Sequence, residues 1–335
     1  MMRARMSLNW WTSVFIVALL FVHAPSGAQE KLKISYSSVD APNANWYIAE
    51  HNRIYQKYGL DVELVFIPTS TTNVTALVAG SIKVGNISGG SIANAVVGGA
   101  NVVAAGCFIN TLPYELIVHE SIRTAQQLKG KSVGISRIGS SSDVAARVLL
   151  KGLGLEPDKD VAILQVGGSG ERAAAFASGK IVAFPSPPGT IHLTKGMTSR
   201  TLITTADFSK SYPFPYVCPT TPRSYLSSNR DTVKRLLMAL IEGTHFFKTR
   251  KEESKKIFAK YSRQSNEAYL ESAYQTIAKL FERVPLATRE GMEVQIGEAL
   301  ASARKAGSGL KAEDIIDDRL VVELEKEGFI ERIYR

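Results

Sequence analysis

Small hydroxyl-bearing and glycine residues recur at the ends of the expected strands of this 335-residue sequence. Nearly all of these stretches lie directly before a segment with the apolar spacing of a helix. A helix start presents unpaired backbone N–H groups and the positive end of the helix dipole, so it can hold an anionic group. Ordinary capping explains any single loop better than a ligand does, but five loops in two blocks of sequence favour one shared cleft. The five stretches are residues 37–38, 69–72, 88–91, 139–142 and 167–170.

The stretch RIGSSSDVAARVLLKGLGL, residues 137–155, is the strongest candidate for a helix start that binds an anion. Gly139 and three serines stand in front of Asp143 and an apolar run at helical spacing. The serines could cap a helix, bind a negatively charged group, or do both. We predict that Ser140 and Ser141, with the N–H groups behind them, hold an anion. Ser141→Ala is then expected to weaken ligand binding well beyond its effect on the melting temperature.

Signatures of catalysis, metal binding and cofactor binding are incomplete. Residues 168–173 have the glycine spacing of a dinucleotide-binding turn, but no acid occurs between Glu171 and Asp207, where the ribose would need one. Residues 130–132, Gly-Lys-Ser, match the last three positions of a P-loop. However, they lie before a strand, whereas a P-loop follows a strand. The five histidines lie far apart, with no pair at the spacing of helical metal ligands. We therefore predict no catalytic residue, no metal site, no cofactor and no enzymatic activity.

The N-terminus has the pattern of a secretory signal peptide. Arg3 and Arg5 precede an apolar run at 14–22 that is too short to span a bilayer, and small residues follow up to Ala28. We predict that residues 1–28 form the signal peptide and that cleavage falls near Ala28. The mature chain is expected to be periplasmic or otherwise exported, and soluble.

The formal net charge of +9 comes from dispersed residues. The densest basic stretch, residues 248–260, mixes glutamates among its lysines and is typical of a solvated helix face. Nucleic-acid binding would need clustered basic residues with interleaved aromatics, so it is not expected. The charge supports only a weak preference for anionic small ligands or an anionic membrane surface.

Two blocks of alternating strands and helices precede a helical C-terminal part. This alternation, with short connections, predicts parallel, doubly wound α/β sheets in two lobes. From Asn229 onward the pattern is nearly all helical, beginning with one long helix over 229–262. Expected strands are 31–37, 60–68, 82–88, 101–110, 131–136, 160–167, 180–184 and 200–206, and the other expected helices are 43–59, 70–80, 90–99, 141–154, 169–179 and 189–195.

Residues 128–181, LKGKSVGISRIGSSSDVAARVLLKGLGLEPDKDVAILQVGGSGERAAAFASGKI, resemble periplasmic substrate-binding proteins of ABC importers. The most similar branch binds sulfonates, taurine, nitrate or the thiamine pyrimidine. Residues 41–65, 76–88 and 224–243 are similar to further parts of that family. The resemblance covers most of 31–250, and the order of the motifs is more specific than any one of them.

The resemblance implies a type 2 periplasmic-binding fold that closes on its ligand like a hinge. Lobe one would comprise 31–112 and 217–335, lobe two 113–216, with a two-strand hinge between them and extra C-terminal helices. The protein would be a monomer that captures a sulfonate, carboxylate, nitrate or pyrimidine for an ABC permease in the membrane. A ligand-sensing or interaction module of the same fold, without a transport role, is an alternative. A pyrimidine-synthesis type of enzyme is disfavoured, because the cysteine-rich motif of such enzymes is missing.

The resemblance also transfers a set of ligand-binding positions. Trp46 could pack on an apolar part of the ligand or belong to the core. Val182-Ala183 stands where many relatives have an Asp-Ala pair, and the loop FPSPPG that follows could shape a different pocket. The implied ligand-binding residues are Ser38, Asn45, Trp46, Thr71, Thr72, Ser88 and Gly89 from lobe one, and Ser140, Ser141, Ser169 and Ser186 from lobe two.

In the implied topology, the two cysteines of the sequence fall on neighbouring antiparallel strands. Cys107 would lie on the strand that leaves lobe one and Cys218 on the strand that returns to it. We therefore hypothesise a cross-strand disulfide between them. A count of free thiols in denatured, unreduced protein tests it.

Overall fold

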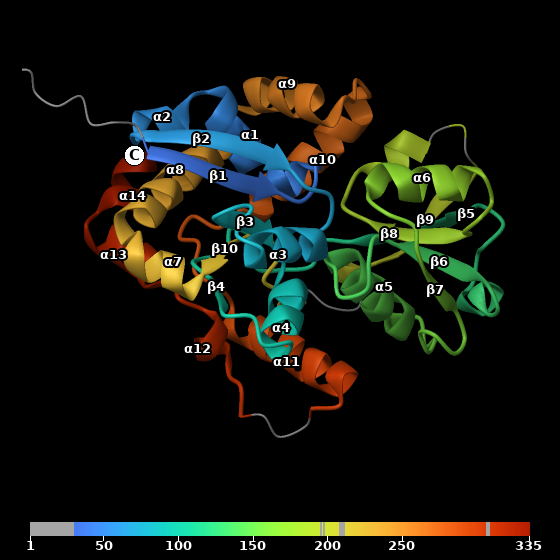
Figure 1. The fold of residues 1–335 in the computed structure, drawn as a ribbon. Helices are drawn as coiled ribbons and strands as arrows, with labels where there is room; N and C mark the ends of the chain where they lie inside the picture. Colours follow the sequence, from blue (N-terminus) through green and yellow to red (C-terminus); the bar gives the residue numbers. More distant parts are fainter. Residues whose placement is uncertain (1–29, 195, 197, 208–211, 306–308) are drawn as a thin grey trace, which may run out of the picture.

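The computed structural model describes residues 30–194, 196, 198–207, 212–305 and 309–335. The expected signal peptide at 1–28 lies outside the described residues. The fold contains two five-stranded sheets, each with helices packed on it (Figure 1). We call the part built on the first sheet lobe one and the part built on the second sheet lobe two.

The sheet of lobe one has the strand order β2-β1-β3-β10-β4. β1 runs parallel to β2 and β3, while β10 is antiparallel to both β3 and β4. Leu32 and Ile34 of β1 are buried, whereas Lys31 and Lys33 are exposed, as expected for a strand with one face on the core. The strands are β1 Glu30–Tyr36, β2 Leu60–Phe66, β3 Val84–Ile87, β4 Val102–Ala104 and β10 Cys218–Pro222.

The sheet of lobe two has the order β7-β6-β8-β5-β9. β6 is parallel to β7 and β8, but β5 is antiparallel to β8 and β9. Both sheets are therefore mixed, with parallel pairs as expected and one antiparallel strand in each. In each sheet, one strand directly follows a connection between the lobes: β5 in lobe two and β10 in lobe one. That strand is antiparallel to both of its neighbours. The strands are β5 Glu115–His119, β6 Ser132–Ile135, β7 Ala162–Gln165, β8 Ala183–Ser186 and β9 Ser199–Thr204.

Helices of the α/β part follow the strands in the expected order. α5 and α6 pack on β6 and β8 of lobe two, whereas α3 and α4 contact β3 and β4 of lobe one. The single helix expected over 43–59 is broken at Arg53, which has a left-handed conformation with φ +54°. The helices are α1 Ala44–His51, α2 Ile54–Lys57, α3 Ser70–Val78, α4 Gly89–Val97, α5 Ser141–Gly152 and α6 Ser169–Ala177, with short 3-10 turns at Ala41–Asn43, Ala125–Leu128, Thr190–Thr194 and Thr205–Asp207.

The C-terminal helices pack mainly on lobe one, with α8 against α1. The helix expected over 229–262 is broken at Arg250 into α8 and α9. No helix in the described part of the chain is long and apolar enough to cross a bilayer. The helices are α7 Arg223–Ser228, α8 Arg230–Thr249, α9 Lys251–Ser262, α10 Glu267–Leu280, α11 Arg289–Ala303, α12 Ala312–Ile315, α13 Arg319–Lys326 and α14 Phe329–Ile333.

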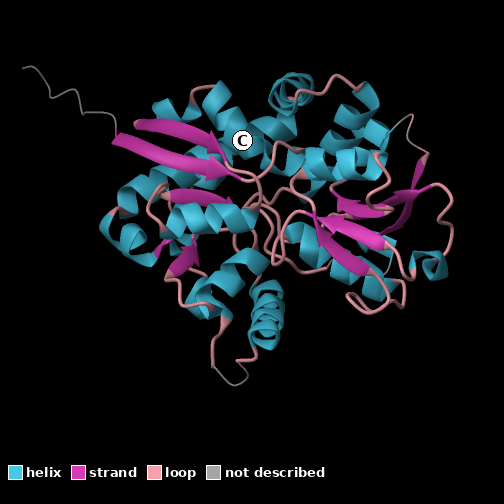
Figure 2. Cartoon of the chain, turned by 45° about the vertical axis from the view of Figure 1, so that its right-hand side comes forward, coloured by secondary structure: helices cyan, strands magenta, loops and turns pink. Residues whose placement is uncertain are grey.

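Two chain segments that lie side by side connect the lobes. The first leaves β4 and enters β5, and the second leaves β9 and enters β10. Phe214 N donates to Asn110 O at 3.0 Å, Tyr216 N to Ile109 O at 2.9 Å, and Phe108 N to Val217 O at 2.8 Å. Figure 2 shows the central band of loops between the two groups of strands. The segment expected as one strand over 101–110 is thus a strand only at β4, and the rest of it belongs to this hinge.

A disulfide joins Cys107 to Cys218 at the lobe-one end of the hinge. Both cysteines are fully buried, in a cluster of apolar residues that includes Ile87 and Ile296. The bond closes a loop of 111 residues that contains all of β5 to β9. It therefore fixes the two connecting segments where they leave the first sheet.

Helix α10 lies against both lobes. It contacts α8 of lobe one and the 3-10 turn Thr190–Thr194 of lobe two, and Asn266 Nδ2 donates to His192 O at 2.9 Å. Gly189 has φ +89°, and a Cβ there would lie 3.1 Å from Ala273 N. A side chain at 189 would therefore meet both backbone strain and the backbone of α10. The FPSPPG loop thus ends in a glycine that lets it sit directly on α10.

A cluster of charges joins α9 to α10 and should make stability depend on pH. Lys255 and Lys251 bond the carboxylate of Glu271 at 2.8 and 2.5 Å, and these bonds lower the pKa of Glu271 to about 2. A depressed folded-state pKa stabilises the protein above the unfolded value of 4.5, and that stability is lost as the pH falls toward 2. We expect wild-type protein to lose more stability between pH 5 and pH 3 than Glu271→Gln does.

Melting temperatures of both proteins across this pH range test the prediction. Glu253→Gln removes the same charge from an exposed position on α9 and should follow the wild type. Parallel curves for wild type and Glu271→Gln would contradict the role given to this carboxylate.

Candidate functional site

A cavity of about 270 Å³ lies between the lobes. Lobe one contributes the loops after β1 and β2, lobe two contributes the first turns of α5 and α6, and the hinge contributes Tyr114 and Tyr216. In α/β sheets, loops at the carboxyl ends of strands border the ligand crevice, and this cavity follows that rule. Its described lining residues include no histidine, cysteine or lysine, so no Ser-His or Cys-His pair is assembled there. The arrangement is suited to binding.

Arg172 is the one arginine of the described cavity lining. It occupies the first turn of α6 and is only 3% exposed. Its Nη1 donates to Gly167 O at 3.1 Å, while its buried Nε has no hydrogen-bond partner within the described structure. Burying a charge without a counter-charge costs several kcal/mol on the order-of-magnitude scale for ions. The cavity thus contains a guanidinium that an anion would stabilise.

Asp40 lies in the same cavity and is 8% exposed. Its Oδ2 accepts hydrogen bonds from Ser38 at 2.5 Å and from Ser169 at 2.8 Å. Ser38 belongs to lobe one, whereas Ser169 is the first residue of α6 in lobe two. The carboxylate therefore connects the two lobes through hydroxyl groups.

Two tyrosines of the hinge also place polar groups in the cavity lining. The hydroxyls of Tyr114 and Tyr216 lie 3.2 Å apart, and that of Tyr114 is 3.1 Å from Ser141 Oγ. Burial raises the pKa of both tyrosines, and the positive charge of Arg172 opposes that rise. Both hydroxyls therefore stay protonated at neutral pH and can donate to a ligand.

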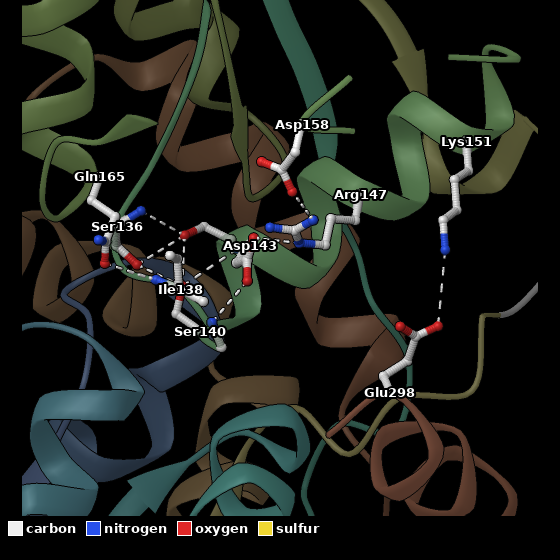
Figure 3. Close-up of polar contacts among 11 residues, drawn as sticks. Ser136, Ile138, Ser140, Asp143, Arg147, Lys151, Asp158, Gln165 and Glu298 are labelled. Carbon is white, nitrogen blue, oxygen red and sulfur yellow. Dashed lines mark hydrogen bonds and ion pairs between the residues drawn. The ribbon is translucent and has the colours of Figure 1, made fainter. Parts of the chain in front are cut away.

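The N-terminus of α5 shows how the serine-rich stretch is used (Figure 3). Ser140 Oγ accepts from Asp143 N at 3.4 Å and from Ser136 Oγ at 2.8 Å, and the Asp143 carboxylate accepts from Gly139 N at 2.8 Å. The N–H groups of Asp143 and Gly139 are thus bonded by the protein's own side chains. Ser140 is 1% exposed and lies outside the cavity lining, whereas Ser141 is part of it.

Substitutions at these two serines should therefore have opposite signatures. Ser140→Ala removes the cap and is expected to cost about 1 kcal/mol of stability with little loss of affinity. Ser141→Ala is expected to leave the melting temperature nearly unchanged and to weaken ligand binding, because its hydroxyl faces the cavity. Thermal melts and titrations of both variants check this; a loss of affinity only in Ser140→Ala would reverse the assignment.

The remaining expected site residues fall into two groups. Ser38 and Ser169 line the cavity with Ser141. The others lie outside its lining. Asn45 and Trp46 are fully buried because α1 packs against α8, and Asn45 bonds Thr244. The rest bond neighbouring protein groups. Thr71 and Thr72 lie beside Thr69, Ser88 N and Gly89 N donate to Ser70 Oγ and Pro215 O, and Ser186 donates to Thr190.

Sequence reasoning missed Asp40, Arg172 and the two tyrosines. Arg172 did leave a signal. A cation near the start of a helix is opposed by the helix dipole, and Arg172 stands there between Glu171 and a run of alanines. Such an unfavourable placement indicates that another group compensates the charge.

Thr69 lines the cavity with a strained backbone, at φ +71°. β-branched residues rarely adopt positive φ, and such strain persists only where the surroundings impose it. The side chain of Thr69 caps α3 by accepting from Thr72 N at 3.3 Å. The cap explains part of the strain, and its position at the cavity rim agrees with a functional site.

Direct contacts also join the two lobes. Besides the bond from Ser169 to Asp40, Ser91 Oγ donates to Gly139 O at 2.9 Å. Lys151 of α5 lies 3.9 Å from Glu298 of α11, as Figure 3 shows. These contacts hold the lobes in the arrangement that the structure shows.

Comparison with protein families gives one match over most of the chain. Residues 42–254 match the family model described as NMT1/THI5 like. A curated relative from Brucella abortus, with the provisional name of a binding protein, is 28% identical over 222 residues. That alignment covers 64% of this chain and 66% of the relative, so the chain spans just under two thirds of the length of the curated relatives it matches.

Solved structures share the fold at low sequence identity. The nitrate-binding protein NrtA from Synechocystis has a TM-score of 0.73 and 16% identity, covering 89% of this chain and 88% of its own. The alkanesulfonate-binding protein SsuA from Xanthomonas axonopodis, bound to MOPS, has a TM-score of 0.70 and 18% identity, covering 86% of this chain and 98% of its own. Both are periplasmic-binding-type folds, as expected from the sequence.

Proposed function

The chain belongs to the NMT1/THI5-like family, and from this premise we propose that it is an exported solute-binding protein. It encloses a small organic anion between its lobes and delivers it, as a monomer, to an ABC permease. The boundaries proposed for its lobes are 31–112 with 217–335 and 113–216. The ligand-binding residues we propose are Arg172, Ser141, Ser169, Ser38 and the hinge tyrosines.

The observation that carries this proposal is the buried, unpaired guanidinium of Arg172. Arginine presents a planar set of donors that matches carboxylate and sulfonate oxygens, and bonds between charged partners are stronger than neutral ones. An anion in the cavity would supply the counter-charge that the guanidinium lacks. The ligand classes of NrtA and SsuA, nitrate and alkanesulfonates, are anions that such a site would accept.

Hydroxyl groups around Arg172 support an oxyanion rather than a halide. Ser141, Tyr114 and Tyr216 can each donate to a different oxygen of the ligand. Ligand bonds made from lobe two and from lobe one would favour the closed state over the open state. By the hinge mechanism, the ligand then stabilises the form that a permease would recognise.

A thermal-shift screen of the mature chain tests the proposal. The panel contains nitrate, ethanesulfonate, propionate, benzoate, taurine and β-alanine, with the neutral compounds cytosine and propionamide as controls. A ligand at about 100 times its dissociation constant adds about 2.7 kcal/mol to stability, which shifts the melting temperature by several degrees. We expect at least one acid to stabilise the protein and the neutral compounds to have no effect.

A uniform absence of shifts, or stabilisation by the neutral compounds alone, would contradict the proposal. Uptake of the labelled hit by cells with and without the gene then tests delivery to a permease. Normal uptake without the gene would favour a ligand-sensing role for the same fold.

A further inference from the structure

The cavity holds a second buried charge that an anion alone would leave uncompensated. Asp40 forms no ion pair in the part of the chain that the structure describes. Its hydrogen-bond donors are the hydroxyls of Ser38, Ser169 and Tyr269, the last at 3.5 Å. These groups are neutral, so they hold the carboxylate in place without cancelling its charge.

The carboxylate also retains capacity for a ligand. An ionised carboxylate offers about four acceptor positions, and the three hydroxyls occupy about three of them. A bare anion brought next to Arg172 would be repelled by Asp40 across this small cavity. A ligand with a cationic group would instead be attracted by it.

The two charges are placed for one small molecule. Ser169 and Arg172 are three residues apart on α6, so they share one face of the helix, and Ser169 contacts Asp40 directly. Tyr114 and Tyr216 lie near both charges: burial mainly raises the pKa of each tyrosine, Asp40 adds to the rise and Arg172 opposes it. A volume of about 270 Å³ accommodates a short molecule that reaches both groups.

We propose that the ligand is a small zwitterion, whose acid group binds Arg172 and whose ammonium group binds Asp40. This inference rests on the proposed function, because it assumes that a solute binds in this cavity. It adds a requirement that the proposed function does not make, namely a positive charge on the ligand opposite the acid.

Matched pairs of ligands test the inference. β-Alanine is compared with propionate, and taurine with ethanesulfonate, by titration calorimetry of the mature wild-type protein and of Asp40→Asn. We expect the wild type to bind at least one zwitterion about 10-fold or more tightly than its plain anion. Asp40→Asn should remove that preference, mainly by weakening the zwitterion. Asp231→Asn, which removes an exposed carboxylate of α8, should keep it.

The outcomes separate the two proposals. Equal binding of both members of each pair by the wild type would overturn the zwitterion and leave the anion-binding function standing. The comparison of each ligand pair in the wild type needs no variant, so it tests the zwitterion even if Asp40→Asn does not fold. Binding of neither member of any pair would overturn the zwitterion; if nitrate and benzoate both failed as well, the proposed function would fail with it.

Discussion

Replacing Cys107 and Cys218 together by alanine should lower the free energy of unfolding by about 4 kcal/mol. The disulfide closes a loop of 111 residues, and in the chain-entropy account a loop of this size is worth between about 4 and 5 kcal/mol. The bond also sits in the apolar cluster of lobe one, so its removal loosens the packing there. Because the loop contains the whole second sheet, the unfolded chain becomes much less constrained without it.

Urea unfolding of wild type and of the double variant, each with and without reductant, measures this effect. The reduced wild type should unfold close to the double variant, and the variant should not respond to reductant. The dependence of the unfolding free energy on urea should also rise, because the uncrosslinked denatured chain exposes more surface. Two free thiols in denatured, unreduced wild type would show that the bond does not form.

The fold could be predicted from the sequence wherever local signals agree. Alternating strands and helices, closed by glycines and prolines, gave the order of β1 to β4 and of β6 to β9. No strand was expected between 110 and 131, so β5 was missed, because ELIVH is a short apolar run without a clear alternation. The break of the helix at Arg53 was also missed. A left-handed arginine has no local sequence signal, because arginine is not a residue type that favours positive φ.

The candidate site could be predicted only in part. Ser38, Ser141 and Ser169 were indicated because hydroxyl groups at strand ends have few roles besides capping and binding. Ser140 has the same local signal and caps α5 instead, since a one-residue difference on a helix turns a side chain by about 100°. Asp40 and Arg172 were missed because charged residues are usually on the surface, and only the packing of α6 and of α10 around the cavity buries them.

Replacing Arg172 by methionine should weaken binding of the acid by about 100-fold or more and should not destabilise the empty protein. Removing one partner of a buried charge pair costs about 2–5 kcal/mol of binding energy, and each 1.4 kcal/mol is about tenfold in affinity. In the empty protein the guanidinium has no described acid partner, so methionine removes a desolvated charge and keeps most of the apolar stem. Losing the attraction of Asp40 across the cavity opposes this gain, so stability should change little.

A loss of affinity without a loss of stability distinguishes a ligand-binding charge from a structural one. A structural arginine would lose stability on substitution, as expected for Arg147, which bonds Asp143 and Asp158 at 2.8 and 2.7 Å. Arg137→Met, at an exposed position of the same lobe, controls for the general loss of positive charge and should keep both affinity and stability. Retained affinity in Arg172→Met would indicate that the anion binds instead at the Ser141 hydroxyl and the start of α5. There the carboxylate of Asp143 already accepts from Gly139 N, so an anion would lie beside a charge of its own sign.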